Sequence, residues 1–113
     1  FGTSLWEPRA NYPGALRFNQ QFIETYGRVP GYHAGLAYAA GQVLQKAVEE
    51  VGRVDKEKVR DALFQLDTMT IIGRFGVDKT GKQVRQHKFI IQWQNGTKEL
   101  VWPDTIKTAN PKF

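Results

Sequence analysis

One stretch of the sequence carries a helical repeat long enough to limit the folds open to this chain. From Tyr32 to Val51 apolar residues recur every three or four positions over about five turns, which predicts an amphipathic helix. They are Leu36, Ala37, Ala40, Val43, Leu44, Ala47, Val48 and Val51. Gly52 comes next and can adopt the left-handed conformation that ends a helix. The fold is therefore built on one long helix, whose alanines allow a close neighbour.

Two shorter helices are predicted on either side of it. The first spans about residues 13–26, because Pro13 suits a first helical position and Gly27 can end the helix after a run of helically spaced apolar residues. The third spans about residues 56–66 behind Asp55, whose side chain can cap the first turn. The first two-thirds of the chain is thus predicted to be mainly helical.

After Asp67 the repeat changes to that of strands, and we predict a β section over about residues 70–103. Asn95-Gly96 lies between two strand-like runs, and both residues tolerate the positive φ angles of a tight hairpin turn. Pro103 closes the second run, because proline cannot donate to a strand ladder. Residues 104–113 lack periodicity and are expected to form a loose tail or a hinge-crossing segment. Helices followed by a β-hairpin section indicate an α/β fold.

Composition excludes several classes of protein. Hydrophobic residues make up 41% of the chain, as expected for a folded domain, and no apolar run approaches the roughly 20 residues of a membrane span. Cysteine is absent, which excludes disulfide scaffolds and thiolate chemistry. The net charge of +5 comes from basic residues scattered along the chain, so nucleic-acid binding is not expected. The first residue is Phe1, from which we expect a processed product or a fragment of a longer protein.

The sequence offers no catalytic or metal-binding constellation. His33 and His87 are the only histidines, and neither stands in a metal-ligand spacing or beside a serine in a nucleophile motif. The carboxylates are mostly typical of solvated helix faces and caps. We therefore expect no enzyme activity, no cofactor and no metal.

Two places combine aromatic and polar groups in a way that suits ligand binding. Tyr32 and His33 lie in the first turn of the long helix, where free amide groups and a positive partial charge favour a carboxylate ligand. Trp6 and Glu7 lie at a strand-to-loop exit before Pro8. The alternative for each pair is structural: an aromatic residue that packs in the core or at a helix start, with a polar neighbour on the surface.

Several short motifs follow one another in an order that is more specific than any of them alone. They are Trp6-x-Pro8, Phe18 to Tyr26-Gly27, Pro30-Gly31-Tyr32-His33-Ala34-Gly35-Leu36-Ala37-Tyr38-Ala39-Ala40, Asp55-x-Glu57-x-Val59-Arg60-x-Ala62-Leu63, Gly73-x-Phe75-x-Val77-Asp78-x-x-Gly81, Gln92-Trp93-Gln94-Asn95-Gly96 and Val101-Trp102-Pro103. This order resembles the C-terminal region of type I periplasmic binding proteins of the branched-chain amino-acid-binding family, which are solute receptors of ABC importers. The resemblance covers nearly the whole chain.

The resemblance implies that residues 1–113 are the C-terminal portion of a two-lobed receptor and form part of one lobe. It implies a periplasmic or other extracytoplasmic location, an amino acid or related small carboxylate or amide as ligand, and an ABC permease as partner. It places Tyr32 and His33 in the ligand cleft, most of which lies upstream. The alternative is a ligand-sensing domain of a receptor or regulator with the same fold. A fragment on its own is expected to self-associate through uncovered apolar surfaces.

Overall fold

The computed structural model describes all of residues 1–113 and contains three helices and five strands. In chain order they are β1 (Gly2–Ser4), α1 (Ala15–Tyr26), α2 (Tyr32–Val51), α3 (Lys56–Gln65), β2 (Thr68–Thr70), β3 (Gly73–Phe75), β4 (Phe89–Gln94) and β5 (Thr97–Trp102). Helices followed by a β section confirm the predicted α/β class.

The long helix α2 has the predicted bounds. Gly52 ends it with a φ of 76°, and its amide donates to the carbonyl of Val48 at 2.8 Å. Gly27 ends α1 in the same way, with a φ of 66°. The predicted start of α1 at Pro13 is wrong. Gly14 has a φ of 81°, which no right-handed helix can include, so the helix begins only at Ala15.

Helix α3 is capped as the sequence predicts, because Oδ1 of Asp55 accepts a hydrogen bond from the amide of Lys58 at 3.1 Å. It ends at Gln65, one residue before the predicted end, since the backbone of Leu66 is already extended. Leu66 is buried there, and β2 starts at Thr68. The β section therefore begins two residues earlier than predicted.

The strands form two separate antiparallel sheets. β2 and β3 make a two-stranded sheet, while the other sheet has the order β1-β4-β5. The predicted β4–β5 hairpin is confirmed: Asn95 and Gly96 have φ angles of 52° and 77°, and Gln94 pairs with Thr97 across the turn. Two segments join the three-stranded sheet to the rest of the chain: residues 5–14 connect β1 to α1, and residues 76–88 connect β3 to β4.

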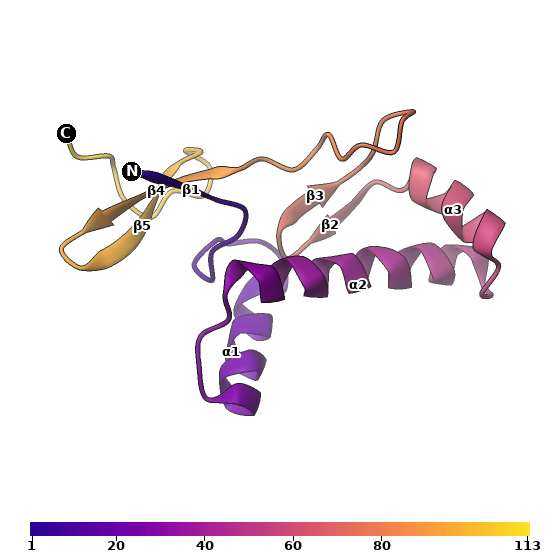
Figure 1. Ribbon diagram of the computed structural model, residues 1–113, viewed down its shortest axis with the longest axis horizontal. Helices are drawn as coiled ribbons and strands as arrows, with labels where there is room; N and C mark the ends of the chain where they lie inside the picture. Colours follow the sequence, from indigo (N-terminus) through magenta and orange to yellow (C-terminus); the bar gives the residue numbers. More distant parts are fainter.

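Figure 1 shows the three-stranded sheet at one end of an elongated molecule and α3 at the other, with α2 between them. α1 leaves the start of α2 at a steep angle, and β2–β3 lies along the opposite side of α2. The molecule measures 50 × 34 × 18 Å, and the chain termini lie close together at the sheet end. The start of α2 therefore lies at the junction between the helices and the three-stranded sheet.

The core consists of two small clusters. The larger is built from Trp6, Ala15, Phe18, Ala39 and Ile71, and fixes the crossing of α1 and α2 under the β2–β3 turn. The smaller joins Ala10, Phe89 and Leu100, and holds the loop before α1 against the three-stranded sheet. Tyr12 packs against both clusters, so it links the two parts of the molecule.

Part of the apolar side of α2 is left uncovered. Ala40 is exposed and Leu44 is 54% exposed, although both belong to the predicted apolar stripe. They line an apolar groove of about 530 Å³ between α2, α3 and the β2–β3 region, to which Phe64 also contributes. We call this the α2–α3 groove. No helix of the structure is long and apolar enough to span a membrane.

The prediction of a loose C-terminal tail is wrong. Residues 104–113 have no regular secondary structure, but they are tied to the three-stranded sheet. The amide of Thr108 donates to the carbonyl of Leu100 at 2.8 Å, and the amide of Lys112 donates to Oε1 of Gln92 at 2.8 Å. The ring of Phe113 lies 5.7 Å from that of Phe1, the residue before β1. The tail is thus held by contacts that no local sequence pattern predicts.

Candidate ligand-binding cavity

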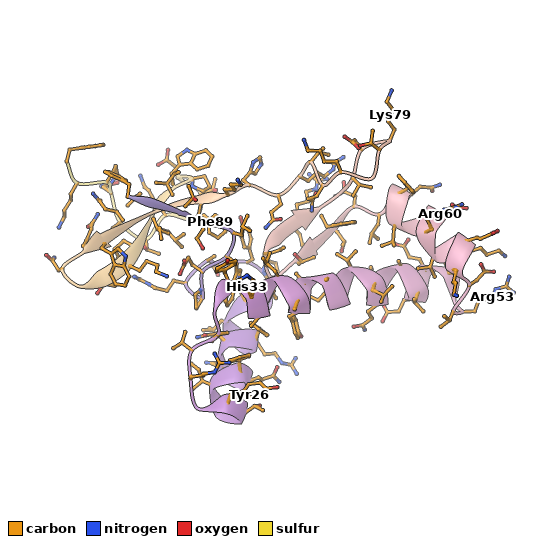
Figure 2. All side chains as sticks on the ribbon, viewed as in Figure 1. Tyr26, His33, Arg53, Arg60, Lys79 and Phe89 are labelled. Atoms are coloured by element: carbon orange, nitrogen blue, oxygen red, sulfur yellow. The ribbon has the colours of Figure 1, made fainter.

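A cavity of about 640 Å³ lies where the helices meet the three-stranded sheet. Three segments bound it: residues 6–9 after β1, residues 29–32 at the start of α2, and part of the β4–β5 hairpin. Asn19 of α1 also reaches it. Figure 2 shows His33 at the end of α2 that faces the three-stranded sheet. We call the cavity described here the junction cavity.

Trp6 forms the floor of the junction cavity and is only 1% exposed. Its Nε1 donates to the carbonyl of Ile71 at 3.0 Å, and its ring packs edge-on against Phe18 at a centroid distance of 5.6 Å. Gly35 of α2 allows the ring to approach the helix backbone closely. Trp6 therefore fixes the loop that carries the next residue, Glu7.

Glu7 and Lys98 meet on one wall of the cavity. Nζ of Lys98 lies 3.3 Å from Oε1 of Glu7, and the side chains are 39% and 13% exposed respectively. The same ammonium lies 5.8 Å from the centroid of the Trp93 ring, within cation–π range. Trp93 is 65% exposed. The hairpin thus brings an indole and a cation to the carboxylate that follows β1.

Tyr32 lies on the opposite boundary, at the first position of α2. Tyr32 is 44% exposed, and its ring stacks on the His33 imidazole at a centroid distance of 4.0 Å. Tyr32 also borders a second cavity of about 280 Å³, which is lined by the end of β1 and by Lys88. His33 is exposed and lines neither cavity.

The start of α2 has no side-chain cap. The residue before it is Gly31, which is extended and has no side chain that could accept from the first amide groups. Its carbonyl accepts from the amides of Ala34 and Gly35, at 3.0 and 3.3 Å, so the amides open to an anion are those of Tyr32 and His33. Such amide groups, together with the positive end of the helix dipole, attract an anion. The junction cavity therefore combines aromatic surface, one ion pair and a helix terminus suited to a carboxylate.

The sequence predicted four ligand-binding residues, and the structure brings three of them, Trp6, Glu7 and Tyr32, to one cavity. Sequence reasoning did not select Trp93 or Lys98, which lie more than 60 residues away from all three. Trp93 fits the apolar alternation of a strand, and this pattern does not distinguish a buried residue from an exposed one. Its exposure is visible only in the folded chain.

A family model described as periplasmic binding protein matches residues 1–98. The chain belongs to the periplasmic binding protein family. The match spans the helices, the β2–β3 sheet and β4, and it confirms the resemblance seen in the sequence. Membership of this family implies an extracytoplasmic location.

Two solved structures share the fold of this periplasmic binding protein chain. One is a leucine-binding protein, LivK, from Thermotoga maritima, with 26% identity over 87% of this chain and a TM-score of 0.70. The other is a solute-binding protein of an ABC transporter from R. palustris in complex with benzoate, with 17% identity over 96% of this chain and a TM-score of 0.76. At 17% identity the likeness is one of fold. Both structures are described as binding proteins.

The chain spans 28% of the leucine-binding protein and 30% of the benzoate complex. Its fold is therefore that of part of a type I periplasmic binding protein. No group of three or more His, Cys, Asp or Glu side chains is placed to hold a metal ion.

Proposed function

We propose that this chain supplies one part of the ligand site of an extracytoplasmic solute-binding protein. The receptor binds an amino acid or a related small carboxylate or amide in the periplasm, or an equivalent space, and delivers it to an ABC transporter. The junction cavity is its contribution to that site, with Glu7 and Tyr32 in contact with ligand, Trp6 as the floor, and His33 supporting the Tyr32 ring.

The observation that carries this proposal is the capless start of α2 beside the Glu7–Lys98 pair. A carboxylate at the helix terminus accepts hydrogen bonds from free amides and is stabilised by the helix dipole. Glu7 can pair with an ammonium group of the same ligand, since it already pairs with the ammonium of Lys98 at 3.3 Å. An amino acid carries both groups.

The two solved relatives support the same chemistry. One is described as a leucine-binding protein and the other was crystallised with benzoate, and both of these compounds carry a carboxylate next to an apolar group. The junction cavity offers aromatic surface from Tyr32 and Trp93, both of which are exposed, next to the helix terminus. A small carboxylate with an apolar body fits these features.

The test is a ligand screen on a receptor-length protein that carries residues 1–113, with the isolated chain measured beside it. Thermal shift and calorimetry with amino acids, small amides and aromatic acids are expected to show saturable binding of at least one compound. Binding raises the melting temperature because the ligand favours the folded state. A screen in which no compound from these three classes binds would contradict the proposal.

A further inference from the structure

We propose that the β4–β5 hairpin determines ligand specificity: Trp93 packs on a planar ring of the ligand, and Lys98 binds its carboxylate. The inference rests on the proposed function and narrows the ligand class to small ring-bearing carboxylates. Aromatic amino acids and simple aromatic acids share this chemistry, and the experiment below distinguishes them.

The exposure of Trp93 is the first observation. Along β4 Phe89 is fully buried, whereas Trp93 on the same strand is 65% exposed and lines the junction cavity. An indole in water leaves a large, flat apolar surface uncovered, and such surfaces bind planar groups well. Trp102 is the other exposed tryptophan of the hairpin, at 48%, but it does not line the cavity.

The second observation is how Lys98 is held. Its ammonium is placed between the carboxylate of Glu7, at 3.3 Å, and the ring of Trp93, at 5.8 Å from the centroid. An ammonium group has three donors, and Glu7 is the only hydrogen-bond partner of this one. The remaining donors can bind a ligand carboxylate beside the indole, so one compound can use both groups.

The third observation concerns charge. The ionic side chains around the cavity form two balanced pairs, Glu7 with Lys98 and Arg9 with Glu99. A zwitterionic ligand preserves this balance, because its ammonium can pair with Glu7 while its carboxylate pairs with Lys98. A simple aromatic acid adds one net negative charge, because it has no ammonium to pair with Glu7 when its carboxylate pairs with Lys98. Aromatic amino acids are therefore expected to bind more tightly than benzoate.

The experiment measures dissociation constants in the receptor-length protein for phenylalanine, tyrosine, tryptophan, benzoate and leucine. In Trp93→Leu, binding of the ring-bearing compounds is expected to weaken about tenfold, while leucine changes less than twofold. Trp93→Phe is expected to restore most of the affinity because it keeps a ring. Trp102→Leu is the matched control and is expected to leave all five constants unchanged.

The Lys98 arm uses Lys98→Met, which keeps the length of the side chain and removes the charge. Binding of every carboxylate is expected to weaken about tenfold, with Lys107→Met as the matched control. Intrinsic fluorescence gives an independent readout. The part of the emission change that a ring stacked on Trp93 causes is expected to be kept in Trp102→Phe and lost in Trp93→Phe, while Trp6 at the floor of the cavity responds alike in both variants.

The outcomes separate the two proposals. If the unchanged protein binds a ligand but Trp93→Leu and Lys98→Met behave like their controls, the hairpin does not set specificity, while the proposed function stands. If leucine binds and no ring-bearing compound does, the ligand class is wrong. If nothing binds, both proposals fail.

Discussion

A Cβ atom on Gly35 would lie 2.6 Å from Cδ2 of Trp6, so the Trp6 indole rests directly on the backbone of α2. The ring is also held from other directions, by the hydrogen bond from Nε1 to the Ile71 carbonyl and by the edge of Phe18. The ring therefore cannot move away from a methyl group added at Gly35 without disturbing these contacts. This contact fixes the start of α2 relative to the loop that carries Glu7.

Gly35→Ala is therefore expected to destabilise the fold by about 1–3 kcal/mol, the usual cost of overpacking a tight core contact. Urea unfolding measures the change. Gly41→Ala is the matched control, because Gly41 lies on the same helix with open space around its Cα. That control is expected to stabilise the fold by about 0.5–1 kcal/mol. Equal effects of the two substitutions would contradict the close contact.

Local signals in the sequence predicted the structure correctly where a single residue determines the backbone conformation. Gly27, Gly52 and Asp55 each end or cap a helix as predicted, and Asn95-Gly96 makes the predicted turn. Pro13 failed as a helix start because the next residue, Gly14, adopts a left-handed conformation. A proline suited to the first position of a helix does not indicate the backbone conformation of the residue after it.

Contacts between distant segments were not predictable in this way. The tail looked loose, yet Gln92 and Gln94 on β4 hold the backbone at Lys112 and Asn110. The junction cavity was likewise only partly predictable. Its helix terminus could be predicted from the sequence, but Lys98 lies 91 residues after Glu7, and no local pattern indicates that the two side chains meet. Such pairings depend on the fold as a whole.

Thr108 is expected to be a principal anchor of the tail. Its hydroxyl accepts a hydrogen bond from the amide of Leu100 at 2.9 Å and donates to the carboxylate of Glu99. Thr108→Val keeps the shape but removes both bonds, which is expected to cost about 1–3 kcal/mol because the Leu100 amide loses its partner. Thr105→Val, at an exposed position of the same tail, is the control and should change little. Urea unfolding measures both, and hydrogen exchange at Leu100 should speed up only in Thr108→Val.

The stability of the fold is expected to fall in acid, partly through Asp67. A hydrogen bond from Arg74, at 2.6 Å, is the main reason that the pKa of Asp67 lies below its ordinary value. Desolvation opposes this effect, and the charges of Arg74 and Arg85 each add a smaller lowering of the pKa. A carboxyl group with a lowered folded-state pKa stabilises the fold above its unfolded pKa, about 3.9, and this contribution is lost as the pH falls through the folded value.

In Asp67→Asn the loss of stability between about pH 5 and pH 2 should therefore be shallower than in the unchanged chain. Melting temperatures measured across this range test the effect. The pKa values of Asp78 and Glu99 are also lowered, chiefly by side-chain hydrogen bonds from Thr80 and Thr108, so part of the acid sensitivity should remain. An identical pH profile in Asp67→Asn would show that the Arg74 contact does not persist in solution.

The isolated 113-residue chain is expected to self-associate through the α2–α3 groove. Its radius of gyration is 15.8 Å, compared with about 13 Å for a compact domain of this length, and Leu44 and Phe64 in the groove are 54% and 45% exposed. In a solution of the isolated chain, a second copy is the partner available to cover this surface. Light scattering should show at least a dimer, and Leu44→Glu should shift the chain to monomer. Val54→Glu, outside the groove at a residue that is 87% exposed, should not. A well-folded monomer at every concentration would contradict this expectation.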